Sequence, residues 1–246
     1  MKSLNCKKVK GYIEGYYGKL LSWNNRYEIL DTLYKNKMNF YFYCPKEDLN
    51  HRLNWREPYD KNWLNDFYRF ILYAKQKKIK IIAGLSPGLN FDFKSYSKGN
   101  KTDLIFLTNK LKTFLEKGVD HVAILFDDIP NDFDLKVQNK EEGEIHSDIV
   151  NNSINILKKT IFTVPRIYSD ELIIENKKYL DDFLKNINKN AYIFYTGKYI
   201  VSDNFSSKHK GVNQKICDNK IIYWDNFYAN DYCPKRLFVG PWKNKK

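Results

Sequence analysis

The stretch HVAILFDDIP, residues 121–130, decides how this chain is interpreted. Its first half, residues 122–126, is a short β-branched and aromatic run that ends in charge and proline, which is typical of a buried β-strand. Two neighbouring carboxylates, Asp127 and Asp128, follow directly. An ionised carboxylate is costly to bury without a partner, so we expect the pair at the rim of a sheet, facing a cleft. Such a pair either marks a functional site or merely serves the next loop.

Similar strand-like runs occur on both sides of this stretch and alternate with helical patterns. Strands are predicted at residues 9–15, 39–43, 80–84, 122–126, 161–164, 191–195 and 220–224, and helices at 23–35, 61–77, 102–115, 144–159 and 179–187. Ser22 and Asp60 are predicted to cap the first two of these helices, and one further short helix is predicted within residues 201–218. This alternation predicts a parallel sheet with helices outside it. The 246 residues suit one α/β domain, residues 1–246, with a TIM (β/α)8-type barrel, which needs about 250 residues. Seven strands are recognisable, because residues 237–240 are too short and loop-like to assign as the eighth.

A distinctive motif follows each predicted strand. The seven motifs in chain order are GYYG, PKED, SPG, FDD, PRIY, YTG and WDN. In a (β/α)8 barrel the carboxyl ends of the strands hold the active site. The shared position of the motifs therefore favours an enzyme over a structural role for the two acids.

The adjacency of Asp127 and Asp128 restricts the chemistry. Glycoside hydrolysis commonly uses two carboxyl groups, set about 5 Å or more apart on either side of the sugar. Neighbours on one strand cannot easily reach opposite faces of one ring. The pair fits better a mechanism in which an N-acetyl group of the substrate is the nucleophile, one Asp orients and deprotonates it, and the other protonates the leaving oxygen. That acid must hold its proton near neutral pH, which burial and an ionised neighbour favour.

The other motifs offer side chains that could bind a sugar. Lys46, Asn226 and Asp231 can hydrogen-bond hydroxyl groups, Trp224 and Tyr168 can form apolar walls, and Gly15 would let the backbone approach a ligand. Each also has a simpler interpretation as a core, turn or solvated residue. Their common edge of the sheet is what favours binding.

Composition adds few constraints. The net charge of +13 would suit a polyanion partner, but the lysines are scattered along the chain and not gathered in one block, so we expect no nucleic-acid partner. The four cysteines form no CxxC pair and have no histidine at metal spacing, so we expect neither a metal site nor a cofactor. The N-terminus lacks the apolar core of a signal peptide, and no apolar run approaches the roughly 18 residues of a membrane span, so the predicted location is cytoplasmic, with no membrane partner.

Longer motifs carry a resemblance to a known family. They are EGYYGKLLSW, YFYCPKEDLNHRLNWREPY, GLSPGLNFDF, LFDDI, YTGKYIVS and WDNFYANDYCPKRLFVGPW, and they cover nearly the whole chain. With them the chain resembles the catalytic domain of glycoside hydrolase family 84, the O-GlcNAcase and β-N-acetylglucosaminidase family. The resemblance implies a (β/α)8 barrel that cleaves terminal β-linked GlcNAc from glycoprotein or glycan, with retention, through an oxazoline.

The resemblance also implies roles for single residues. Asp127 would polarise the acetamide, and Asp128 would act as general acid and then as base. The substrate-binding residues would be Gly15, Lys46, Tyr168, Trp224, Asn226 and Asp231. The chain departs from the family pattern at Glu47, at Tyr195, and at Arg166 and Ile167 just before Tyr168.

Two alternatives follow from the resemblance itself. The family continues beyond GPW into a last helix and strand with a sugar-binding Asn, so a catalytically weak GlcNAc-binding remnant is one alternative. The positive charge leaves room for a hyaluronidase-like activity on an acidic glycan as the other.

Overall fold

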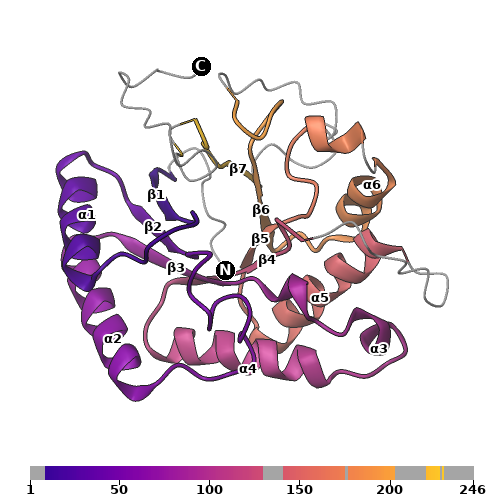
Figure 1. Ribbon diagram of the computed structural model, residues 1–246, viewed down its shortest axis with the longest axis horizontal. Helices are drawn as coiled ribbons and strands as arrows, with labels where there is room; N and C mark the ends of the chain where they lie inside the picture. Colours follow the sequence, from indigo (N-terminus) through magenta and orange to yellow (C-terminus); the bar gives the residue numbers. More distant parts are fainter. Residues whose placement is uncertain (1–8, 130–140, 175–176, 203–219, 228, 230–246) are drawn as a thin grey trace.

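A computed structural model describes residues 9–129, 141–174, 177–202, 220–227 and 229 of the chain. Its seven strands form one parallel sheet in the order of the sequence. They are β1 (Gly11–Glu14), β2 (Phe40–Tyr43), β3 (Lys80–Leu85), β4 (His121–Leu125), β5 (Ile161–Val164), β6 (Ala191–Tyr195) and β7 (Ile221–Tyr223). The sheet curls so that β1 and β7 form its two ends, with the helices arranged around the outside (Figure 1). The predicted α/β, (β/α)8-type barrel with seven recognisable strands is thereby confirmed.

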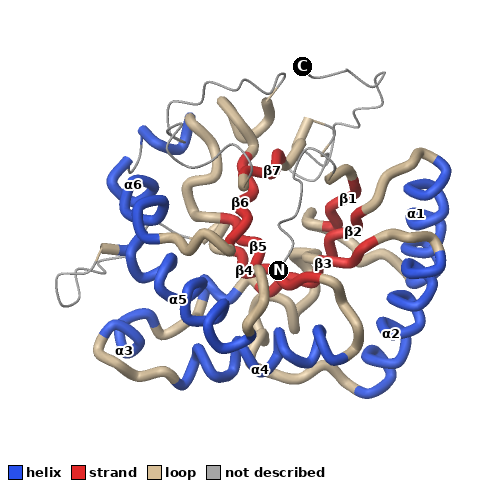
Figure 2. Tube along the Cα trace, turned by 180° about the vertical axis from the view of Figure 1, so that it is seen from behind, coloured by secondary structure: helices blue, strands red, loops and turns tan. Residues whose placement is uncertain are grey.

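The helices connect successive strands on the outer face of the sheet. They are α1 (Trp23–Lys35), α2 (Lys61–Gln76), α3 (Phe93–Ser97), α4 (Thr102–Glu116), α5 (Glu142–Leu157) and α6 (Lys177–Asn186), with short 3-10 turns η2 (Pro87–Leu89) and η3 (Glu171–Ile174). The reverse view shows the same curled sheet with helices to its left, below it and to its right (Figure 2). None of the described helices combines the length and apolarity needed to cross a bilayer.

The strands are apolar on both faces, as expected where helices cover one side and a barrel interior the other. Successive side chains of a strand point to opposite faces. Tyr41 and Ile124 belong to the cluster that packs against the helices, whereas Phe42, Ala123 and Leu125 belong to a second cluster inside the curl. Phe42 stacks on Phe194 of β6 across that interior, with 5.1 Å between the ring centroids. The interior is thus a packed core beneath the carboxyl ends of the strands.

Two predicted helix caps are confirmed. The Ser22 side chain accepts a hydrogen bond from the backbone N–H of Asn25, and the Asp60 side chain accepts one from Trp63. Both satisfy an amide that has no partner within the first helical turn. Most predicted boundaries lie within two residues of the observed ones, although α3, η2 and η3 were not predicted. The short helix predicted within residues 201–218 falls outside the described residues except for 201 and 202, and the segment 237–240 lies outside them altogether.

A buried ion pair joins the end of β1 to α1. Glu14 is fully buried, and Arg26 donates to both of its carboxylate oxygens, at 2.7 Å from Nη2 to Oε1 and 3.0 Å from Nε to Oε2. The Tyr41 hydroxyl donates a further bond of 2.5 Å to Oε2. Burying a carboxylate is tolerable only with such partners, so the pair orients the chain where β1 leads into the first loop of the site.

Replacing Arg26 with methionine should destabilise the protein, because the Glu14 carboxylate would stay buried without its counter-ion. We expect a loss of about 3 kcal/mol in the free energy of unfolding, measured by urea denaturation. Arg69→Met is the matched control, because Arg69 pairs with Asp66 on the surface of α2 and should contribute little. Equal effects of the two substitutions would contradict this account.

The described histidines are neutral because they are buried. Burial lowers the pKa of His51 to about 3 and that of His121 to about 4, and lowers that of His146 well below its usual value. An unfolded chain takes up these protons near pH 6.5, so stability should fall as the pH drops below that value. His51 alone should account for a loss of about 2 kcal/mol in the free energy of unfolding between pH 7.5 and pH 5. Urea denaturation across this pH range measures how the free energy of unfolding changes with pH. In His51→Gln this change should be smaller than in wild type, whatever the stability of the variant at pH 7.5. An unchanged pH dependence would refute the assignment to His51.

Candidate active site

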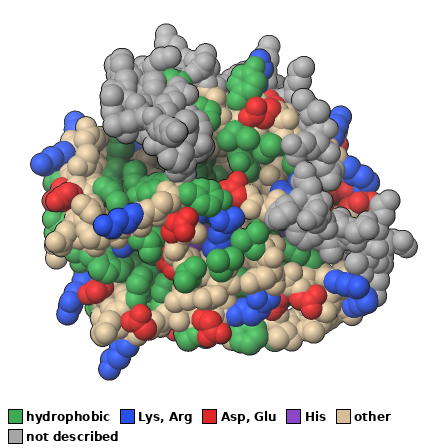
Figure 3. All heavy atoms as spheres, viewed as in Figure 1, with side chains coloured by type: hydrophobic (Ala, Val, Ile, Leu, Met, Phe, Trp, Pro, Cys, Tyr) green, Lys and Arg blue, Asp and Glu red, His purple; other side chains and the backbone are tan. Residues whose placement is uncertain are grey.

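A cavity of about 1310 Å³ opens at the carboxyl ends of the strands. It is lined by the loops that follow β1, β2, β4, β5, β6 and β7, so six of the seven predicted motifs reach it. In the space-filling view a hollow lies near the middle of the face, with acidic, basic and apolar side chains at its edge (Figure 3). The seventh motif, SPG, does not line the cavity. Its Gly88 lies beneath the loop after β4, where an added Cβ would be 2.7 Å from Ile129.

The two acids lie side by side on the cavity wall but differ in exposure. Phe126 continues the β4 ladder with a hydrogen bond of 2.9 Å from its N–H to the Val164 carbonyl. Asp127 is buried, whereas the Asp128 side chain is 32 % exposed. Asp128 adopts the left-handed backbone conformation, with φ at +57°. The deeply buried member of the pair is therefore Asp127, and Asp128 is the more accessible acid.

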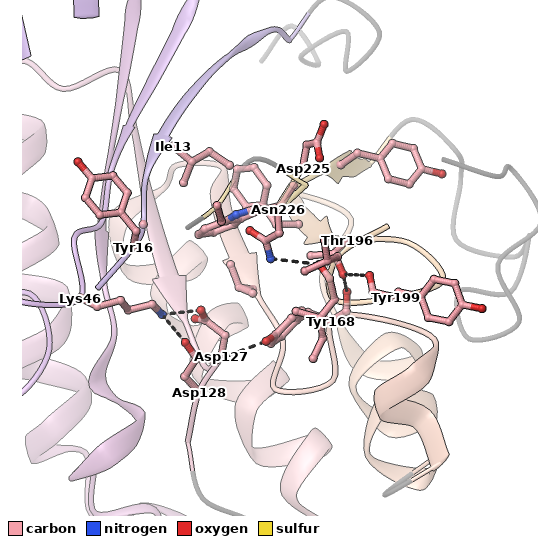
Figure 4. A pocket seen from close by; sticks show the side chains of 18 of the residues that line it. Ile13, Tyr16, Lys46, Asp127, Asp128, Tyr168, Thr196, Tyr199, Asp225 and Asn226 are labelled. Carbon is pink, nitrogen blue, oxygen red and sulfur yellow. Dashed lines mark hydrogen bonds and ion pairs between the residues drawn. The ribbon is translucent and has the colours of Figure 1, made fainter. Parts of the chain in front are cut away.

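Lys46 joins the two acids. Its Nζ lies 2.5 Å from Asp127 Oδ2 and 3.5 Å from Asp128 Oδ2, and Figure 4 shows it directed at both carboxyl groups. The backbone after β2 is held beside that after β1, since Cys44 N–H donates to the Glu14 carbonyl and Lys46 N–H to the Tyr16 carbonyl. The Lys46 side chain is only 2 % exposed, so its interpretation as a solvated lysine is wrong.

Burial and charge act against each other at this pair. Burial raises the pKa of the Asp127 carboxyl above its ordinary value, and the nearby Lys46 ammonium opposes that rise. Burial alone would lower the pKa of Lys46, but the carboxylates of Asp127 and Asp128 raise it overall. Lys46 therefore stays a cation, and its charge compensates the buried carboxylate.

One oxygen of Asp127 is left available. Lys46 occupies Oδ2, whereas Oδ1 is buried and accepts no hydrogen bond from any described residue. A buried acceptor without a donor is costly, so it identifies a position where a ligand N–H would be stabilised.

The loop after β2 is anchored beneath Lys46 by a buried carboxylate. Asp48 accepts hydrogen bonds from the hydroxyls of Tyr43 at 2.5 Å and Tyr59 at 2.7 Å. Lys110 of α4 donates to the carbonyls of Asn50 and Glu57, and so ties two points of the loop to a helix. These supporting residues were missed at the sequence level, because nothing in their spacing shows which loops they join.

Tyr168 enters the cavity from the loop after β5. Its hydroxyl lies 3.4 Å from Asp128 Oδ1, and its carbonyl accepts a hydrogen bond from the Thr196 N–H after β6. The preceding Arg166, one of the departures from the family pattern, forms a buried pair with Glu142 of α5 at 2.5 Å. That pair anchors the loop, so the departure leaves Tyr168 directed at the acids.

Gly15 and Trp224 meet across the two ends of the curled sheet. A Cβ on residue 15 would lie 2.5 Å from Cζ2 of Trp224, so only glycine leaves room for the indole. Trp224 is partly buried, lines the cavity and packs edge-on against Phe42 and Phe194. It therefore serves both the core and the wall. Asn226 also lines the cavity and donates to the Ile200 carbonyl at 3.2 Å (Figure 4).

Two expectations from the sequence remain, Asp231 as a sugar-binding residue and the lack of a metal site. Asp231 lies outside the described residues. Across the described ranges, no group of three or more His, Cys, Asp or Glu side chains could hold a metal ion.

Comparisons with known proteins show which family the chain is similar to. A family described as beta-N-acetylglucosaminidase matches residues 10–246 of the chain. Protein O-GlcNAcase of Mus musculus is 29 % identical over 247 residues, which cover 96 % of this chain and 26 % of the mouse protein. The Rattus norvegicus protein of the same name matches equally. The chain thus spans about a quarter of the length of these relatives.

A solved structure resembles the fold closely. An Asp-to-Asn mutant of the Thermobaculum terrenum O-GlcNAc hydrolase superposes with a TM-score of 0.85 and 30 % sequence identity. The match covers 97 % of this chain and 52 % of that one.

Gly15→Ala should distort the cavity wall because the new Cβ collides with the Trp224 indole. We expect the free energy of unfolding to fall by about 1–3 kcal/mol, measured by urea denaturation. Trp224→Phe removes the ring atoms that collide, so Gly15→Ala should cost much less in that background. An equal cost in both backgrounds would show that Trp224 is not the obstacle.

Proposed function

Since the chain belongs to the β-N-acetylglucosaminidase family, we propose that its cavity hydrolyses terminal β-linked GlcNAc with retention of configuration. The substrate's own acetamide is the nucleophile, Asp127 polarises it, and Asp128 is the general acid and then the base. The observation that carries this proposal is the pair of adjacent acids with unequal environments, bridged by Lys46 at 2.5 and 3.5 Å.

The environment of Asp127 supports its role. Its Oδ1 has no hydrogen-bond donor among the described residues and can take the acetamide N–H, while the Lys46 ammonium at Oδ2 opposes the rise that burial causes in the pKa of Asp127. Because the carboxylate accepts this hydrogen bond and polarises the amide, the acetamide oxygen becomes more nucleophilic and attacks the anomeric carbon. The C–O bond to the leaving group breaks, and an oxazoline forms on the sugar.

The environment of Asp128 supports the proton transfers. Its side chain faces the open cavity, where it can protonate the departing oxygen. The resulting carboxylate then takes a proton from a water molecule. This water attacks the anomeric carbon from the face that the leaving group has left, and so opens the oxazoline. Attack by the acetamide and then by water inverts the anomeric carbon twice, which gives net retention.

The remaining cavity residues suit a single sugar ring. Trp224 supplies an apolar wall, Tyr168 lies beside the acids, and Asn226 offers an amide to hydroxyl groups. Gly15 admits the Trp224 ring. The names of the mouse protein and of the bacterial hydrolase favour O-GlcNAc on protein as the substrate.

The protein should release the aryl group from a chromogenic aryl β-GlcNAc. Asp127→Asn should lower kcat/KM by about 10²- to 10⁴-fold, and Asp128→Asn should do so where the leaving phenol is basic enough to need a proton, because each removes a group that moves or attracts a proton in the transition state. Replacing the acetyl of the substrate by trifluoroacetyl should also slow the reaction, because the fluorines weaken the amide oxygen as a nucleophile.

Asp66→Asn is the matched control, because Asp66 lies on the surface of α2 and should leave the rate unchanged. A wild type that binds a GlcNAc-oxazoline mimic without turning over the aryl substrate would be a GlcNAc-binding remnant instead. Turnover that does not respond to the trifluoroacetyl group would rule out the substrate's amide as the nucleophile.

A further inference from the structure

Two residues outside the proposed set contact Asp128. The Tyr17 hydroxyl, from the GYYG motif after β1, donates a hydrogen bond of 3.0 Å to Asp128 Oδ2. Arg52, from the loop after β2, donates from Nη2 to the backbone carbonyl of Asp128, also at 3.0 Å. The Arg52 guanidinium lies over the Tyr17 ring, 5.3 Å from its centroid. The loops after β1 and β2 therefore both hold this one acid.

The backbone contact matters because of the conformation of Asp128. A non-glycine residue in the left-handed region costs free energy and persists only where its surroundings hold it. Arg52 supplies such a restraint at the carbonyl, and its stacking on Tyr17 keeps the guanidinium in place. The direction of the Asp128 carboxyl thus depends on Arg52.

The hydroxyl contact matters because of the two protonation states of Asp128. Tyr17 remains a proton donor, since burial, followed by the charge of Asp128, raises its pKa above the ordinary value. A donor of this kind favours the ionised carboxylate over the protonated acid. The other charged or titratable groups that face Asp128 among the described residues are Asp127, Lys46 and Tyr168.

We propose that Tyr17 and Arg52 are positioning residues for Asp128: Arg52 fixes the direction of its carboxyl group, and Tyr17 stabilises the carboxylate left after proton transfer. The inference rests on the proposed function, because it assigns both residues to the step in which Asp128 protonates the leaving group. The rate of cleavage should depend little on Tyr17 and Arg52 when the leaving group departs readily without a proton. It should depend strongly on them when the leaving group is basic.

The test is the kinetics of Tyr17→Phe and Arg52→Met on aryl β-GlcNAc substrates whose leaving phenols increase in basicity. With a nitrophenol as leaving group, kcat/KM of each variant should stay within about twofold of wild type. With an alkylphenol, kcat/KM should fall by about 10-fold, which is a part of the rate enhancement that a general acid contributes. The basic limb of the pH profile of kcat/KM should move to higher pH in Tyr17→Phe, by about half a unit, because the ionised acid has lost a donor.

Tyr68→Phe is the matched control, since Tyr68 is a similarly exposed tyrosine on α2, and it should reproduce the wild type in every measurement. Tyr17→Phe removes a single oxygen atom, so it keeps the test valid even if Arg52→Met does not fold. If wild type cleaves the substrates but Tyr17→Phe leaves both the leaving-group dependence and the basic limb unchanged, the inference is wrong and the proposed function stands. A uniform rise in KM for all substrates would mean that Tyr17 contacts the substrate instead. If wild type cleaves none of the substrates, the proposed function itself fails.

Discussion

The site depends on the compensation of one buried carboxylate. Asp127 is buried in the cavity wall, and an ionised group there is stable only because Lys46 brings its charge within 2.5 Å. Neither residue could stay charged in that place without the other. The two follow different strands, β2 and β4, and the strand order places these on either side of β3, so the arrangement of the sheet is a condition for the chemistry.

Much of the surrounding structure holds this pair in register. Asp48, with its two tyrosine hydroxyls, and Lys110 fasten the loop that carries Lys46. Glu14 and Arg26 orient the end of β1, whose backbone continues the ladder to Cys44. These contacts use charged and polar groups that take no part in the proposed reaction. They keep the cavity rigid, which a mechanism that depends on fixed donors and acceptors requires.

The sequence predicted the strands and helices well because their formation depends mainly on residues that are close together in the chain. Apolar runs of four to six residues, the caps Ser22 and Asp60 and the alternation of elements all act over short distances. It also predicted the edge where Lys46, Asp127 and Tyr168 gather, since parallel strands place their carboxyl ends together. It was less successful with exposure: Lys46 is buried, and Asp128 is the more accessible acid.

The sequence by itself thus determined the architecture, the position of the two acids and, through its long motifs, the resemblance to a glycosidase family. Only the tertiary structure decided how those acids differ. Lys46, Tyr168, Tyr17 and Arg52 reach them from loops that are far apart in the chain. Burial and charge at a residue depend on everything packed around it, and no local pattern contains that information. The reason that Gly15 must be glycine is equally nonlocal, because the atom that excludes a side chain belongs to Trp224, 209 positions later in the chain.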